Sequence, residues 1–584
     1  SADWRDIMAR RLFDQESNRL FYGQQLVPEP GYSLDFAVGM TYSLDLNAFL
    51  GIPISLGMLD NLESAGAKNP FYLLEAIRKS GDRIAVFCNA GSIHTPKKSE
   101  PVHILLEQSI FQVALGPKTN FHPKVWVIRY RNSDGDTYIR VVVLSRNIAF
   151  DRCFDIAASL TGEVGGRVCE ANRPLSDLLR FVSGFADGDP VKRKLIRSVA
   201  DDVLKVREFA PMECFDSVEF LPVGIPGYKK IAEPELSGAR SLVLVSPFLS
   251  DGVVKALTVS AKQTALITRK SSITPTALSS FQDVFVTKEL VLDNELLEEG
   301  ESEETPQRDI HAKIFFEERD DGKYLYLGSL NASANAFYHN VEFMLKLRYR
   351  PYYASFTSVL GDLVPEEQSP FERIETMDEL SETAEQEDPA DLQDVVYAVK
   401  QAKVTSNGEL YTVHISCGAL ESPCEIALFG ASSVYRNLAK EVVFEKVSLT
   451  ALSEFYIVRR GNVSTIIKIP TVGIPAEERD NAIYSTIIGD RRGFFRYVSF
   501  LLSDNYAETS LEEQMLGMES ANEASASAAV AGVYEQLLRT AAENPERLAA
   551  VENMMSRLNP EIVDERFRVL ISTCRSAAKQ VKRK

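Results

Sequence analysis

Two short stretches of the chain carry the same pair of residue types, a histidine and a lysine separated by one residue. The pairs are His122 with Lys124, and His311 with Lys313. Side chains at positions i and i+2 of a strand point to the same face, so we expect each imidazole to lie beside an ammonium group. The chain has only six histidines, and two of them occupy these matched contexts.

A hydroxyl and a carboxamide follow each pair. Ser145 and Asn147 stand at the end of the next strand-like run after the first pair, and Ser329 and Asn331 take the same place after the second pair. Together these groups suit a phosphate ester. Lysine and asparagine hold its non-bridging oxygens, and histidine attacks phosphorus or protonates a leaving oxygen.

The runs that must position these residues form two similar series. Each series ends in two strand-like runs that are joined through an Asp-Gly pair, Asp134-Gly135 in the first and Asp321-Gly322 in the second, and such a pair is a strong hairpin signal. Strand-like runs that alternate with helical stretches predict an α/β fold. The sequence therefore indicates a divergent tandem repeat of one sheet-plus-hairpin unit. The runs are residues 35–45, 83–90, 110–116, 121–131 and 138–145, then 241–249, 264–270, 283–290, 310–318 and 323–330.

The two hairpins carry a family resemblance. HAKIFFEERDDGKYLYLGSLNASANAFYHNVEF resembles the HKD motif of the phospholipase D superfamily, and HPKVWVIRYRNSDGDTYIRVVVLSRNIAFDRCFD resembles the other half with departures. Arg129 and Glu318 stand where the family often has Asp, and Leu144 stands where it has Gly. In lacking that acid, the chain is similar to the tyrosyl-DNA phosphodiesterase and nuclease branches, which often lack it as well. The resemblance covers roughly residues 30–360.

The resemblance implies a bilobed α/β fold in which both hairpins meet at one pseudo-twofold cleft. By analogy with the phosphodiesterase branch, His122 becomes a covalent phosphohistidine, and His311 acts as general acid and then as base for water. The family needs no metal, so neither a metal nor a cofactor is expected. The ordinary imidazole pKa near 6.5 predicts a bell-shaped pH–rate profile near neutrality.

Two acids follow the asparagines at similar offsets, Asp155 in the first motif and Glu342 in the second. One interpretation makes them partners that orient a histidine ring. The alternative is that they are ordinary acids at strand edges. The remaining histidines show no metal-ligand spacing and are interpreted as structural: His94, His103, His339 and His414.

Three basic residues near the first motif are candidates for contacts to nucleic acid. Arg146, inside Ser-Arg-Asn, could grip a neighbouring phosphate of a polymer, or it could pair with a local acid. Lys118 and Arg129 belong to a basic cluster around the same hairpin.

The net charge of −18 over 584 residues is concentrated in two segments. Residues 293–304 hold seven acids and no base, and residues 362–394 hold thirteen acids and one base, so the remainder is near neutral. A near-neutral body can carry local basic clefts. The first segment is either a solvated loop or a mobile gate that mimics phosphates in front of the cleft. The second segment predicts a linker.

The other features are those of a protein of the cytoplasm. Apolar residues make up 45% of the chain, and no apolar run is long enough for a membrane span. The first residues lack the pattern of a secretory signal. The seven cysteines are scattered without a Cys-x-x-Cys pair, which favours reduced, buried thiols.

Five regions are predicted. They are a first repeat over 1–230, a second repeat over 231–360, the acidic linker over 361–394, a β-rich domain over 395–475 and a mostly helical region over 476–584.

The leading functional hypothesis is a metal-independent phosphodiesterase or endonuclease that acts on nucleic acid, with DNA favoured over RNA. The opening DFAVGMTYSLDL and the HPKVW...LSRN pairing resemble bacterial phospholipase D-like proteins of anti-phage defence neighbourhoods, which implies a helicase or ATPase partner. The alternatives are a catalytically weak DNA-binding scaffold subunit and a phospholipid-acting enzyme. No membrane partner is expected, and a homo-oligomer is left open.

Overall fold

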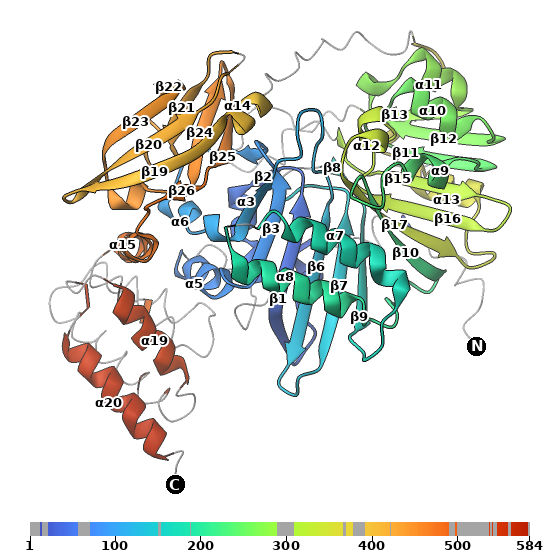
Figure 1. The fold of residues 1–584 in the computed structure, drawn as a ribbon. Helices are drawn as coiled ribbons and strands as arrows, with labels where there is room; N and C mark the ends of the chain where they lie inside the picture. The colour runs from blue at the N-terminus through green and yellow to red at the C-terminus, as the bar shows by residue number, and fades with distance from the viewer. Residues whose placement is uncertain are drawn as a thin grey trace, which may run out of the picture.

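The computed structural model describes the two predicted repeats, the β-rich region and part of the helical region (Figure 1). In the described residues, no helix is both long and apolar enough to cross a membrane. The acidic run 293–304 lies outside the described residues. These are 12–13, 22–56, 70–149, 153–186, 188–288, 309–365, 369–377, 392–420, 422–489, 494, 497–498, 537, 540, 546–558, 562–563 and 565–581.

The first repeat is built on a six-stranded mixed sheet with the strand order β5-β3-β1-β6-β7-β9. Strands β1, β3 and β5 run parallel, and β6, β7 and β9 pair antiparallel. The strands are β1 (Tyr32–Thr41), β3 (Ile84–Asn89), β5 (Ile110–Val113), β6 (Val125–Asn132), β7 (Thr137–Leu144) and β9 (Ala157–Glu163).

Both faces of this sheet are covered, which explains why its strands are nearly continuous apolar runs. Alternate residues of β6 enter different cores, as the two-residue period of a strand requires. Val125 and Val127 pack in the core that includes α7 (Arg173–Ser183) and α8 (Pro190–Val203), whereas Trp126 packs in a core shared with α5 and the C-terminal helices. Figure 1 shows α7 and α8 lying across the sheet. The smaller helices of this repeat are α2 (Tyr22–Gln25), α3 (Leu46–Leu50), α4 (Ile52–Ser55), α5 (Pro70–Ser80) and α6 (Pro101–Ile104).

The second repeat has an eight-stranded sheet of order β10-β17-β16-β15-β11-β12-β13-β18. Its six inner strands follow the same order and directions as the first sheet, which confirms the tandem repeat. The strands are β10 (Phe215–Val223), β11 (Ser241–Val245), β12 (Gln263–Thr268), β13 (Asp283–Thr287), β15 (Ile314–Glu318), β16 (Lys323–Gly328), β17 (Glu342–Tyr349) and β18 (Phe371–Arg373).

The outer strands of this sheet correct two predicted boundaries. Strand β10 pairs with β17, so the second sheet begins before residue 231. Strand β18 pairs with β13, so part of the predicted linker 361–394 belongs to the second repeat. A three-residue strand such as β18 carries too little apolar pattern to be recognised from sequence.

The second sheet is also covered on both faces. The helices α9 to α12 contribute to one core, and α13 packs in the core that both repeats share. That shared core contains Val127 of β6 and Phe316 of β15, so the two lobes are packed as one body. The helices are α9 (Ala232–Leu236), α10 (Asp251–Thr258), α11 (Pro275–Ser280), α12 (Ala334–Tyr338) and α13 (Phe356–Leu363).

Two very short strands join the lobes. Strand β8 (Cys153–Phe154) of the first repeat pairs in parallel with β14 (Asp309–Ile310) of the second. In Figure 1, β8 lies between the two lobes. This pairing fixes the chain immediately before His311 to the chain immediately before Asp155.

The predicted β-rich domain contains two sheets. The first has the order β23-β20-β19-β26, and the second extends through β25 onto β4 and β2 of the first repeat. The domain is therefore hydrogen-bonded to the first repeat rather than separate from it. The strands are β2 (Leu44–Asp45), β4 (Ile93–His94), β19 (Val399–Asn407), β20 (Leu410–Cys417), β21 (Glu425–Leu428), β22 (Arg436–Asn437), β23 (Glu441–Val447), β24 (Phe455–Arg460), β25 (Val463–Lys468) and β26 (Thr471–Val472).

The described part of the C-terminal region is helical, in agreement with the prediction. Val563, Phe567, Ile571 and Cys574 lie in the core that also contains Trp126. The helices after the second repeat are α14 (Gln393–Ala398), α15 (Ala476–Ile488), α19 (Glu546–Arg557) and α20 (Glu565–Val581).

Candidate active site

The first histidine–lysine pair lies between an isolated bridge and the start of β6. Phe121 forms a parallel bridge with Val341, and the His122 backbone N–H donates to the Val341 carbonyl at 2.8 Å. Lys124 Nζ lies 3.1 Å from His122 Nε2. The imidazole and the ammonium are therefore side by side, as their spacing predicts, although residues 122–124 precede the strand instead of forming part of it.

The acid that orients His122 comes from the other repeat. Glu342, the first residue of β17, accepts a hydrogen bond from His122 Nδ1 at 2.7 Å. It also accepts from Ser329 Oγ, and from Asn340 Nδ2 at 3.1 Å. A fully buried carboxylate with three donors is fixed in place and keeps its charge satisfied. Because a carboxylate only accepts, the His122 proton lies on Nδ1 and the lone pair of Nε2 faces the lysine.

The second pair shows the same crossed backbone pattern. The N–H groups of His311 and Ala312 both donate to the Phe154 carbonyl, at 3.0 and 2.9 Å. Phe154 directly precedes Asp155, just as Val341 directly precedes Glu342. Each histidine backbone is thus bonded to the residue before the acid of the opposite motif.

The serines complete this pseudo-twofold arrangement. Ser145 Oγ donates to Asp155 Oδ1 at 3.0 Å and accepts from the Ile156 N–H at 2.9 Å. Ser329 Oγ donates to Glu342 and accepts from the Phe343 N–H at 3.0 Å. Both serines are fully buried. Their role is to hold the acids and not to reach solvent.

Burial makes His122 a weak base. It lowers the pKa of His122 to about 4; the carboxylate of Glu342 opposes this shift, and the charges of Lys124 and Lys313 add to it. His122 is therefore neutral at neutral pH. The effect of Lys313 also shows that the ammonium of the second motif acts on the histidine of the first.

Lys313 and Asn331 are both buried at the second half of the site. Lys313 Nζ donates to the His311 carbonyl at 2.5 Å, as Lys124 Nζ does to the His122 carbonyl at 3.4 Å. Among the described residues, the carboxamide oxygen of Asn331 has no hydrogen-bond partner. Because that oxygen only accepts hydrogen bonds, the non-bridging oxygens of a phosphate would have to meet the Nδ2 group of Asn331 instead.

Asn147 is more exposed than Asn331. It is partly exposed, and its Oδ1 lies 3.5 Å from the Ser43 N–H. The residues before the two serines also differ. Gly328 has φ of 152° and a side chain there would overlap the Phe343 carbonyl, whereas Leu144 is accommodated in the first motif.

Of the three predicted nucleic-acid contacts, Arg129 is contradicted by the structure. Its buried guanidinium bonds Asp35 at 2.6 Å and Asp202 of α8 at 2.8 Å, so it ties β6 to β1 and α8. The position where the family often has Asp thus has a structural role in this chain. The sequence alone predicts Arg129 in a basic cluster that binds nucleic acid, because its two acids are distant along the chain.

Arg146 and Lys118 have different surroundings. Arg146 Nε lies 3.9 Å from Asp155 Oδ2, and its Nη2 donates to the Ala149 carbonyl at 2.8 Å. Arg146 therefore pairs with a local acid, and that acid belongs to the site. Lys118 is exposed in the loop that leads to Phe121, with a positive φ of 66°.

The sequence analysis missed three residues at the site. The Tyr42 ring lies 5.0 Å from the His122 ring, and Cys153 Sγ lies 3.8 Å from His311 Nε2. Asn89 Oδ1 accepts from the N–H of Phe121 at 2.9 Å. Tyr42 follows the carboxyl end of β1 and Asn89 is the last residue of β3, and that position was the available signal. Cys153 gave no signal, since its neighbour is 158 residues away.

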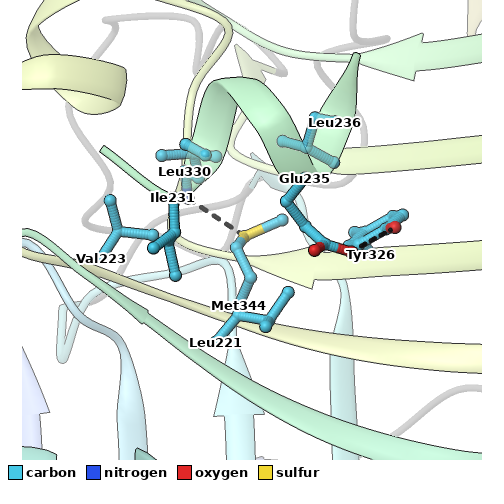
Figure 2. A pocket seen from close by; sticks show the side chains of 9 residues that line it. Leu221, Val223, Ile231, Glu235, Leu236, Tyr326, Leu330 and Met344 are labelled. Carbon is cyan, nitrogen blue, oxygen red and sulfur yellow. Dashed lines mark hydrogen bonds between the residues drawn. The ribbon is translucent and has the colours of Figure 1, made fainter. Parts of the chain in front are cut away.

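The described residues hold a small apolar pocket that is separate from this site. Figure 2 shows it between α9 and the second sheet, with Met344 and Leu330 in its wall and the Tyr326 hydroxyl bonded to Glu235 at 3.0 Å. Elsewhere in the described ranges, no three His, Cys, Asp or Glu side chains gather in an arrangement that could hold a metal ion.

Comparison with known proteins gives structural matches only. No protein-family model and no curated protein matches the sequence. A solved structure of polyphosphate kinase from Porphyromonas gingivalis matches with 11% identity and a TM-score of 0.30, over 56% of this chain and 42% of that chain. The yeast tyrosyl-DNA phosphodiesterase matches with 12% identity and a TM-score of 0.32, over 55% of this chain and 84% of that chain. A mutant of the yeast enzyme matches with 11% identity and a TM-score of 0.34, over 59% of this chain and 88% of that chain.

Proposed function

We propose that this protein is a phosphodiesterase that cleaves nucleic acid through a phosphohistidine on His122. The observation that supports this most directly is the crossed contact between His122 and Glu342. It brings an acid of the second motif to the histidine of the first, which supports one shared site with two histidines and two buried lysines. If the two motifs formed separate sites, the histidine of one motif would have no reason to hydrogen-bond the acid of the other.

The first chemical step uses the neutral state of His122. Its Nε2 lone pair attacks phosphorus, a P–N bond forms, and the bond from phosphorus to the leaving oxygen breaks. Glu342 accepts the Nδ1 proton in a hydrogen bond and stabilises the positive ring that results. His311 delivers a proton to the leaving oxygen.

In the second step, His311 takes a proton from water, whose oxygen attacks phosphorus. The P–N bond breaks, and His122 is regenerated. The non-bridging oxygens carry negative charge in both steps. They are held by Lys124, Lys313, Asn147 and Asn331. Because the two lysines supply that charge compensation, we propose that the reaction proceeds without a metal ion or other cofactor.

Nucleic acid is the proposed substrate because cations extend beyond the two lysines. Arg146 lies beside Asp155, and Arg269 donates to the carbonyl of Ile310, the residue before His311. A polymer offers these groups neighbouring phosphates, which a lipid headgroup lacks. We propose DNA before RNA, although both are arms of the test.

The role in the cell rests on the sequence resemblance alone. We propose an effector subunit of a bacterial anti-phage defence complex, located in the cytoplasm, with a helicase or ATPase partner. The acidic run 293–304 remains a proposed gate for the cleft. Its deletion is expected to raise cleavage at matched salt, and an unchanged rate would contradict the gate.

The decisive experiment is a cleavage assay in the presence of EDTA on labelled single- and double-stranded DNA and RNA. We expect cleavage by the wild type and cleavage slowed by about 10²–10⁴-fold in His311→Ala. A second assay follows headgroup release from phosphatidylcholine vesicles, where no turnover is expected. Stoichiometric DNA binding without cleavage of any substrate would instead favour the scaffold hypothesis.

A further inference from the structure

Phe248 has an exposed aromatic side chain in the loop after β11. It lies at the end of the second sheet where the candidate site is found. It follows β11, whose last residue Val245 pairs with Ile314, the first residue of β15. The loop after β11 therefore lies at the end of β15 from which Lys313 and His311 project. The ring is 49% exposed, although most large aromatic residues of this lobe are buried.

The backbone that presents this ring is held at three consecutive residues. Ser246 Oγ donates to the Phe248 carbonyl at 2.8 Å, and Ser272 Oγ donates to the Pro247 carbonyl at 2.6 Å. Leu249 forms a bridge with Ala332, the residue after Asn331. Exposure of the ring is thus a fixed feature of the loop, and the loop is tied to the catalytic motif.

Arg269 connects the same ring to His311. Its guanidinium carbon lies 4.6 Å from the centre of the Phe248 ring, a cation–π distance. Its Nη2 donates to the Ile310 carbonyl at 3.2 Å. The Arg269 guanidinium therefore covers one face of the Phe248 ring and is hydrogen-bonded to Ile310, the residue before His311.

The equivalent places in the first repeat hold different residues. Ser43 corresponds to Phe248, because Thr41 Oγ1 donates to its carbonyl as Ser246 Oγ does to that of Phe248. Asn89 corresponds to Arg269, since each bonds the backbone of the residue before its histidine. The aromatic–arginine pair is thus an addition to one half and is not required by the shared fold.

We propose that Phe248, backed by Arg269, is a stacking platform for one base of a single-stranded polynucleotide whose scissile phosphate lies at His122 and His311. The inference rests on the proposed function and adds strandedness to it. A base in a duplex already has both faces stacked, whereas a single-stranded base offers a free face to an aromatic ring. The guanidinium adds charge for the adjoining phosphate.

The test measures binding in the His311→Ala background, so that cleavage does not interfere. The probe is a fluorescein-labelled single-stranded DNA 20-mer, compared with its duplex and with a 20-mer that has abasic sites throughout its centre. Stacking is worth roughly 1–3 kcal/mol per base, so Phe248→Ala should weaken binding of the intact single strand about 5- to 150-fold. The loss should be several-fold smaller on the abasic strand. Phe248→Trp should restore affinity, and its added fluorescence should fall when the strand binds.

Tyr352→Ala is the matched control, because Tyr352 is 88% exposed and lies outside the site. It should leave the affinity unchanged. An unaltered affinity in a folded Phe248→Ala protein, or an equal loss on intact and abasic strands, would overturn the platform. If the wild type cleaves DNA and Phe248→Ala does not affect it, only this inference fails. If no nucleic acid is cleaved but binding depends on Phe248, the proposed chemistry fails and the platform stands.

Discussion

The two halves of the site share one backbone plan and differ in how tightly their acids are held. Glu342 is fully buried and accepts from three side chains, including His122 of the other half. The side chain of Asp155 is 16% exposed and is bonded to Ser145, with Arg146 at 3.9 Å. Duplication supplied the symmetric frame. Under the proposed function, the unequal side chains would allow two identical imidazoles to serve as nucleophile and as acid, which need different protonation states.

Removing either histidine is expected to have the largest effect. His122→Ala removes the group that forms the bond to phosphorus, so its loss of kcat should exceed the roughly 10²–10⁴-fold that acid–base catalysis contributes. His311→Ala should lose about 10²–10⁴-fold, because the nucleophile remains. Single-turnover cleavage of labelled DNA measures both.

The two variants also separate the roles. Acid-quenched His311→Ala reactions on a substrate with a good leaving group should retain a covalent phosphoenzyme, because that leaving group does not need the acid while breakdown needs the base. His122→Ala should retain none. A phosphoenzyme in His122→Ala would exchange the two assignments.

The acids should follow in the same unequal order. Glu342→Gln replaces a carboxylate, which only accepts, by a carboxamide that can offer a donor to His122. The tautomer with its proton on Nδ1 is then no longer enforced, and a loss of about 10²–10⁴-fold in kcat is expected. Asp155→Asn should cost about 10-fold, since its surroundings are less buried. The measurement is kcat beside the thermal midpoint of each variant. Equal losses would show that the halves are not specialised.

The sequence was sufficient for the repeated unit but not for the way its two copies interlock. Matched histidine, lysine, serine and asparagine spacings predict the hairpins, because strands and turns are local in sequence. The crossing of His122 to Glu342 joins residues 220 positions apart, and no local pattern encodes it. For the same reason Arg129 was misassigned, as its acids Asp35 and Asp202 are brought to it only by the folded sheet and α8.

A substitution of Arg129 tests whether the cations of the first hairpin stabilise the fold or bind the substrate. Arg129→Met removes the buried guanidinium that Asp35 and Asp202 share and leaves them the more exposed Arg131 and Lys205, which should lower the free energy of unfolding by about 3 kcal/mol. DNA affinity of the folded protein should not change. Thermal unfolding and a binding titration measure the two quantities. A stable variant with weakened DNA binding would restore the nucleic-acid role.

The pH profile tests the contrast between the histidines more finely. Because burial lowers the pKa of His122 to about 4, the neutral nucleophile is retained on acidification down to about that pH. The acidic limb of kcat/KM should therefore fall tenfold per unit below pH 4 and not near 6.5, where an ordinary imidazole would place it. The basic limb reports deprotonation of the general acid. An acidic limb near 6.5 would mean that His122 is not the buried, neutral group of this site.

Lys118 provides the mildest test of the first half, because an exposed lysine contributes to binding only through charge. Lys118→Ala should weaken DNA binding about 2- to 5-fold and reduce the slope of log affinity against log salt by about one. Lys262→Ala is the control, since Lys262 is exposed at the opposite end of β12 from the site. It should leave the slope unchanged. Equal slopes for both variants would place the polymer path away from the loop before Phe121, so that the second half, with Arg269, would have to guide the strand alone.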